Sequence, residues 1–161
     1  LNADATTVSV GYYEGGVYNN YWVLIFSYPE NSHTEDYRQE VLDLVNAQRA
    51  KYGLTALEMG DDDLTAAAQT RAEEIAVVNS HVRPDGSKCF TVLKDYGVTD
   101  TPTGENAAWG SVSPEEVVNA WMNSEGHRAN ILNPEARKMS VGYYYNSNST
   151  WGHQWIQIFT K

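Results

Sequence analysis

Beyond residue 30, apolar residues recur every three or four positions, which is the spacing of one face of an α-helix. In the first such stretch, Ser32 and Glu35 form a capping-box pattern and Gly53 provides a stop. A second stretch follows the acidic residues 61–63, which suit the positive end of a helix. The apolar faces of the two predicted helices are Tyr37, Val41, Leu44, Val45 and Tyr52 in the first, and Leu64, Ala67, Ala68, Ala72, Ile75 and Ala76 in the second.

Two shorter helical stretches and a closing pair of strands complete the pattern. The sequence FTVLKDYG (90–97) predicts a short helix that ends at Gly97. Residues 113–116, SPEE, combine an N-cap serine with a proline at the first helical position, and this helix is expected to end near Glu125–Gly126. HRANIL (127–132) then opens another helical turn. Helices followed by a hairpin favour an α+β fold over a parallel sheet.

The first 29 residues nearly repeat the end of the chain. VSVGYY (8–13) matches MSVGYY (139–144) and YWVLIFS (21–27) matches QWIQIFT (154–160), with eight of 13 aligned residues identical. Each copy is typical of a strand, a loop and a strand. We therefore predict an N-terminal β-hairpin in residues 1–30, either an added hairpin or the remnant of a preceding related domain, and a main domain in residues 31–161. The apolar strands should join a sheet, in the same chain or, by hairpin exchange, in a second copy.

Composition narrows the classes of partner. The 161 residues carry a net charge of −10, which argues against nucleic acid and anionic membranes because phosphate binding requires clustered Lys and Arg. The single cysteine, Cys89, excludes an intrachain disulfide, and its apolar surroundings in sequence predict a buried structural thiol. No apolar run reaches 18 residues, so no transmembrane helix is predicted, and no signal peptide is visible.

Three short motifs carry the candidate chemistry. His81 lies in SHVRPDGS (80–87), Glu105 in GENAAWG (104–110) and His127 in SEGHRANIL (124–132). Two imidazoles and a carboxylate are suitable ligands for zinc or a similar divalent cation. We expect the three side chains to converge at helix ends and glycine turns. Each also has an ordinary alternative role, such as capping a helix or stabilising a turn.

These motifs, in this order, resemble the CAP superfamily, named for cysteine-rich secretory proteins, antigen 5 and plant pathogenesis-related proteins. The chain is most similar to the disulfide-free, SCP-like extracellular domains of bacteria. The resemblance runs from Tyr37 to Lys161 and rests on VNAQRAKYGL, SHVRPDGS, GENAAWG, AWMNSEGHRANIL and the terminal hairpin. It implies an α–β–α sandwich, with a small antiparallel sheet between helical layers, and a surface cleft lined by histidines and acidic residues.

The resemblance places His81, Glu105 and His127 in that cleft. The fourth family position, an acidic residue three after the tryptophan of the fourth helix, is Ser124 here, and Glu125 follows one residue later. A shift of one residue turns a helical side chain by about 100°. Asn106 is a further candidate, for ligand binding or for a turn.

The expected function is an extracellular or cell-surface bacterial module whose cleft binds a divalent cation or a small ligand without catalysis. Two alternatives remain open. One is a hydrolase, either metal-assisted or built on Ser124, His127 and Glu105; the other, implied by the resemblance alone, is lipid or sterol binding. The oligomeric state is expected to be a monomer or a hairpin-exchanged dimer.

Overall fold

A computed structural model describes residues 7–27 and 34–161 of the chain. The chain divides into two compact units, one ending at Ser32 and the other beginning at His33.

The second unit contains helices and strands that alternate more than the sequence pattern indicated. In chain order they are α1 (Thr34–Lys51), β3 (Glu58–Met59), α2 (Asp62–Val77), the 3-10 turn η1 (Cys89–Thr91), α3 (Val92–Asp95), β4 (Pro102–Trp109), α4 (Pro114–Asn123), α5 (Glu125–Ile131), β5 (Lys138–Asn146) and β6 (Gly152–Thr160).

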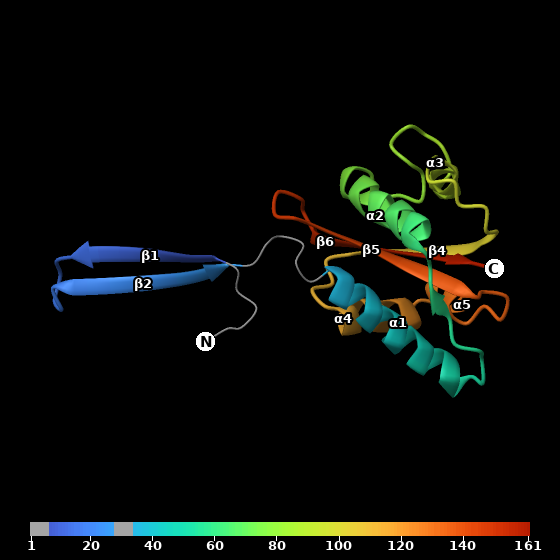
Figure 1. The fold of residues 1–161 in the computed structure, drawn as a ribbon, viewed down its shortest axis with the longest axis horizontal. Coiled ribbons are helices and arrows are strands. Elements are labelled where there is room, and N and C mark those ends of the chain that lie inside the picture. Colours follow the sequence, from blue (N-terminus) through green and yellow to red (C-terminus); the bar gives the residue numbers. More distant parts are fainter. Residues whose placement is uncertain (1–6, 28–33) are drawn as a thin grey trace. The chain divides into compact units, whose positions relative to one another are not determined.

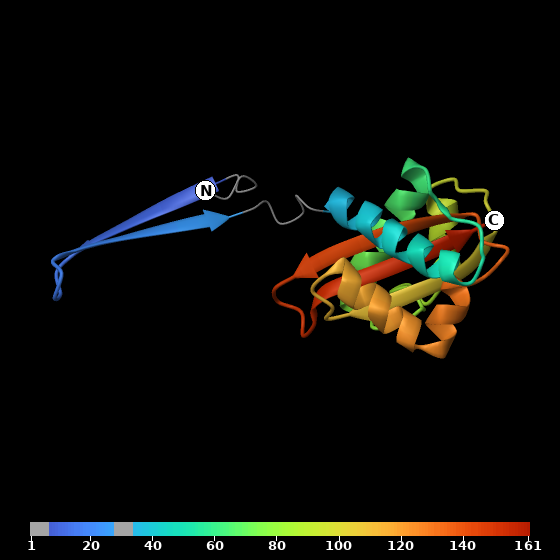
Figure 2. The same cartoon turned by 90° about the horizontal axis from the view of Figure 1, so that it is seen from below.

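A four-stranded sheet in the order β3-β5-β6-β4 forms the middle layer of this unit. Helix α2 and the short α3 cover one face, and α1, α4 and α5 cover the other (Figures 1 and 2). β4, β6 and β5 run antiparallel, whereas the two-residue β3 joins the edge of β5 in parallel. The expected α+β class and α–β–α sandwich are therefore confirmed.

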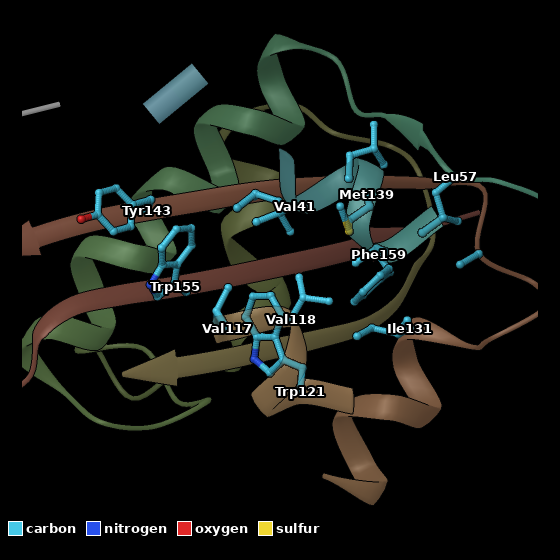
Figure 3. Close-up of a cluster of buried hydrophobic side chains, with 14 residues drawn as sticks. Val41, Leu57, Val117, Val118, Trp121, Ile131, Met139, Tyr143, Trp155 and Phe159 are labelled. Atoms are coloured by element: carbon cyan, nitrogen blue, oxygen red, sulfur yellow. The ribbon is translucent and has the colours of Figure 1, made fainter. Parts of the chain in front are cut away.

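Each face of the sheet has its own apolar core. The α2 side is built from small residues such as Ala67, Ala68 and Ala72, which allow the helix to approach the sheet closely. The α1 side is built from larger groups, with Trp121 of α4 and Trp155 of β6 both essentially inaccessible to solvent (Figure 3). Strand β6 is consequently buried on both faces.

Local sequence signals account for most helix ends. The Asp61 side chain caps α2 by accepting a hydrogen bond from the Leu64 amide, and the Ser113 side chain caps α4 in the same way. Gly53 has a φ of +68° just after α1, as expected for a terminating glycine. The capping box predicted from Ser32 and Glu35 lies outside the residues whose side chains the structure describes.

Two of the predicted elements are wrong in detail. GENAAWG was expected at a glycine turn beside a helix, but residues 104–109 form most of β4, where Glu105 pairs with Ile158 of β6, and Gly110 follows the strand. Helix α4 was expected to reach Glu125–Gly126, but it ends at Asn123 because Ser124 has an extended backbone. Glu125 and Gly126 instead form the first turn of α5.

The first unit is an antiparallel hairpin of β1 (Thr7–Glu14) and β2 (Asn20–Ser27). The predicted ordered hairpin is thus confirmed. β1 and β2 form a two-stranded sheet, and the expected addition of this hairpin to a larger sheet stays a prediction.

Candidate functional site

The candidate site is built around a carboxylate held inside the domain. Glu105 projects from β4 with only 2% of its side chain exposed, and its Oε2 lies 3.0 Å from Nε of Arg71 on α2. The Arg71 side chain is fully buried, and its Nη2 also approaches Oε1 of Glu105 at 3.3 Å. A two-point contact between a guanidinium and a carboxylate fixes the orientation of both groups.

His81 completes this cluster from the loop after α2. Its Nδ1 lies 2.7 Å from Oε1 of Glu105, while 55% of its side chain remains exposed. The hydrogen bond to Glu105 raises the pKa of His81 above its ordinary value, although partial burial opposes the change. Burial acts to raise the pKa of Glu105, but its bonds to His81 and Arg71 outweigh burial and lower it. Glu105 is therefore an ionised carboxylate that orients an exposed imidazole.

A second layer of charges ties the His81 loop to α2. Arg71 Nη1 also contacts Oε2 of Glu74 at 2.6 Å, and its Nη2 donates to the Ser80 carbonyl at 3.2 Å. Arg83 contacts Oε1 of Glu74 at 2.7 Å and Oδ2 of Asp95 at 2.8 Å. Arg71 was not among the site residues predicted from the sequence, although an arginine on an alanine-rich buried face was the available signal.

An amide network links Glu105 to His127. Asn106 Nδ2 donates to the His127 carbonyl at 3.1 Å and to Oε1 of Gln157 at 3.0 Å. Asn130 Nδ2 donates to the Glu105 carbonyl at 3.1 Å and to Oδ1 of Asn106 at 2.8 Å. The buried Asn106 therefore connects α5 to the sheet, and within the described residues it forms no hydrogen bond to either imidazole ring. Asn130 and Gln157 were not predicted as site residues.

His127 lies on α5 with a half-buried side chain. Burial lowers its pKa, and the charge of His81 lowers it further. The two imidazoles thus interact electrostatically, and their pKa values move in opposite directions. In the structure His81 and Glu105 are in contact, and His127 is joined to them through Asn106.

The two remaining candidate site residues, Ser124 and Glu125, lie at the start of α5. Ser124 is half-buried and Glu125 is exposed. Within the described residues, neither side chain forms a hydrogen bond to His81, Glu105 or His127. Glu105 orients His81 rather than His127, so the three groups of the serine-hydrolase alternative are not arranged as a triad, which requires a serine–histidine hydrogen bond and an acid on that same histidine.

The lone thiol lies near the same carboxylate. Cys89 is buried, as predicted, and burial together with the nearby Glu105 charge raises its pKa to about 11. Because the thiolate is the reactive form, this cysteine is poorly suited to nucleophilic chemistry at neutral pH.

The predicted three-ligand metal site stays a prediction, and the contacts of Glu105 bear on it. Both Glu105 oxygens already face cationic or N–H groups, since Arg71 reaches both and His81 reaches one. In the described part of the chain, no group of three or more His, Cys, Asp and Glu side chains is arranged to hold a metal ion. The donors that remain are the second ring nitrogen of His81 and the imidazole of His127.

The fold and these motifs define a CAP-type domain. Residues 42–159 match the cysteine-rich secretory protein family, CAP, and the chain belongs to this family.

Named relatives are bacterial and plant proteins. The chain is 41% identical over 127 residues to the uncharacterized protein YkwD of Bacillus subtilis, covering 78% of this chain and 49% of that protein. It is 29% identical over 115 residues to pathogenesis-related protein 1C of Nicotiana tabacum, covering 70% and 59%. The chain thus spans about half the length of YkwD.

Solved structures show the same fold. An extracellular protein with an SCP domain from Bacillus anthracis superposes with a TM-score of 0.70 at 25% identity, covering 87% of this chain and 47% of that one. An outer surface protein of Borrelia burgdorferi superposes with a TM-score of 0.65 at 26% identity, covering 81% and 95%. No helix among residues 7–27 and 34–161 is both long and apolar enough to cross a membrane.

Proposed function

We propose that this domain acts outside the cell as a non-catalytic binding module, and that His81 and His127 together bind a divalent cation such as zinc. The observation that carries the proposal is the 2.7 Å contact between Nδ1 of His81 and Glu105. With Nδ1 engaged, the other nitrogen of an exposed imidazole is the one left to bind. A carboxylate behind a histidine is the usual partner of a metal-binding imidazole because it fixes the ring and raises its basicity.

Glu105 acts in this proposal as the orienting group rather than as a ligand. Arg71 neutralises its charge and keeps the carboxylate buried. A site with two protein ligands leaves several coordination positions to water or to a small polar ligand. Binding is therefore expected to be weak, in contrast to that of a closed structural zinc site.

The extracellular assignment is supported by the named neighbours. The structures from Bacillus anthracis and Borrelia burgdorferi are described as an extracellular and an outer surface protein. The acidic net charge of −10 is compatible with a cation as the ligand. Protease treatment of intact cells expressing the protein, with a cytoplasmic marker as control, tests this assignment through loss of the domain from immunoblots.

Isothermal titration calorimetry with zinc at pH 7.5 tests the ligand. Both His81→Ala and His127→Ala should weaken binding by about tenfold or more. His153→Ala is the matched control, since His153 is also half-buried but bonds to Tyr143 on the β5–β6 side. Absence of heat with folded wild-type protein, or equal loss in the control, would refute the cation proposal.

One observation favours lipid binding as an alternative to cation binding. A mainly apolar surface pocket of about 310 Å³ lies beside η1 and α3. Its lining residues are Lys88, Phe90, Thr91, Leu93, Lys94, Val98, Asp100 and Pro102. An apolar floor with two lysines fits a short acyl chain with an anionic head. Titration with decanoate tests lipid binding in this pocket. Leu93→Asp is the pocket variant, and the zinc-site variants His81→Ala and His127→Ala are the controls.

A further inference from the structure

The N-terminal hairpin reproduces the β5–β6 hairpin in register as well as in sequence. Val8 pairs with Phe26 as Met139 pairs with Phe159, and this correspondence holds through Tyr13–Tyr21 and Tyr144–Gln154. The two hairpins nevertheless have different loops. Their common register therefore reflects the matched strand residues rather than a shared turn.

An aromatic pair is reproduced with the same geometry. The rings of Tyr12 and Trp22 lie 4.7 Å apart at 44°, and those of Tyr143 and Trp155 lie 4.4 Å apart at 48°. In β5–β6 this pair is packed under α1 and α4, where Tyr143 is 7% exposed and Trp155 is 0% exposed. In the hairpin, Tyr12 is 51% exposed and Trp22 is 68% exposed.

The opposite face of the hairpin is also uncovered. Val23 and Ile25 are 55% and 60% exposed, whereas the matching Ile156 and Ile158 are fully buried under α2. A two-stranded hairpin with two apolar faces is at best marginally stable alone in water. Both faces therefore require the kind of cover that β5–β6 receives.

A glycine lies at the same place in both hairpins. At Gly142, an added Cβ would lie 2.0 Å from the Ala68 carbonyl oxygen, so glycine is required there for α2 to approach the strand. The matching Gly11 has no such neighbour, since an added Cβ would meet Val23 atoms only at 3.8 Å and beyond. Glycine weakens a strand unless another backbone approaches closely. Gly11 has the same free space above it that Gly142 gives to α2.

We propose that residues 7–27 are the closing hairpin of a second CAP-type sheet, and that its partner is a CAP helical core lacking a closing hairpin of its own. That core supplies a helix like α2 against Gly11, helices like α1 and α4 against Tyr12 and Trp22, and a strand like β4 beside β2. An intact second copy of this chain is a poorer partner, because its equivalent place is already filled by β5 and β6.

A hairpin transplant in the full chain tests whether residues 8–27 can close a CAP-type sheet. The variant replaces residues 139–160 with a copy of residues 8–27, carrying glutamine at the position of Leu24 so that Asn106 keeps the acceptor now provided by Gln157. The expected result is a cooperative thermal transition with a near-ultraviolet circular dichroism signal. A transplant that does not fold, beside a wild type that does, would overturn the proposal.

A glycine-to-valine change made in two places provides the matched control. In the transplant, valine in place of the copied Gly11 should lower the melting midpoint by about 10 °C or more, because the valine side chain would collide with α2. As Gly11→Val in the native hairpin, it should leave the main transition within about 1 °C. Equal effects at the two places would contradict the assignment of Gly11.

Hydrogen exchange and light scattering on the unmodified chain test whether the hairpin is covered when no partner is present. The proposal requires a monomer in which the amides of residues 7–27 exchange much faster than those of β5 and β6. Slow exchange in a monomer would mean that the hairpin needs no partner. Slow exchange in a dimer would mean that a second copy covers it, and either result would overturn the proposal.

Discussion

Replacing Glu105 with glutamine should strongly destabilise the domain. The substitution preserves the shape of the side chain but removes the charge that compensates the fully buried Arg71. Breaking a buried ion pair by removing one partner costs about 3–5 kcal/mol, because the remaining charge stays out of water. Glutamine retains one oxygen for Arg71, and Glu74 still contacts Nη1, so about 3 kcal/mol is expected. For a unit of this size that corresponds to about 10 °C in the melting midpoint.

Urea and thermal unfolding, followed by circular dichroism at pH 7, measure this loss. Glu73→Gln is the matched control, because it makes the same chemical change at an exposed position on α2. The double variant Arg71→Met with Glu105→Gln should be less destabilised than Glu105→Gln alone, since no buried charge is left uncompensated. A loss below about 1 kcal/mol, or one equal to that of Glu73→Gln, would refute the reasoning.

The pH dependence of the same variant gives a further check. The folded-state pKa of Glu105 is lowered, so its contribution is present above the unfolded pKa of about 4.3 and is lost as the pH falls through the folded value. The difference in stability between wild type and Glu105→Gln should therefore shrink in strongly acidic solution.

Three further predictions concern His81, Gly142 and Cys89. In urea titrations, His81→Gln should lower the free energy of unfolding more at pH 6 than at pH 8.5. The pKa of His81 is raised in the folded state. Its contribution to stability is therefore complete below the unfolded pKa of about 6.5 and is lost as the pH rises through the folded pKa. A pH-independent cost would contradict the ion pair with Glu105. Gly142→Ala should destabilise the domain by about 3 kcal/mol or more, since its Cβ would overlap the Ala68 carbonyl, and an unchanged melting curve would show that α2 can move away. Cys89, with its pKa raised to about 11, should not react with a disulfide reagent at pH 7.5 until urea unfolds the domain, and rapid labelling of folded protein would show the thiol to be accessible.

Local sequence signals determined the helices of this protein. Asp61, Ser113 and Gly53 act through hydrogen bonds or backbone conformations within a few residues, so their effects can be predicted without knowing the fold. The ordered motifs around His81, Glu105 and His127 likewise indicated the family. The repeated hairpin was visible for the same reason, because strand alternation and turn residues are local features.

Only the tertiary structure decided the chemistry of the candidate site. GENAAWG contains small and polar residues that suggest a turn, yet pairing with β6 makes it a strand and directs Glu105 into the interior. Arg71 is 34 residues from Glu105 in sequence, and only the packing of α2 across the sheet brings the two together. Arg71 contacts both carboxylate oxygens of Glu105 and His81 contacts one of them, and these contacts are the basis for proposing Glu105 as an orienting group rather than a ligand. Such long-range pairing depends on the geometry of the whole sheet, which no single stretch of sequence contains.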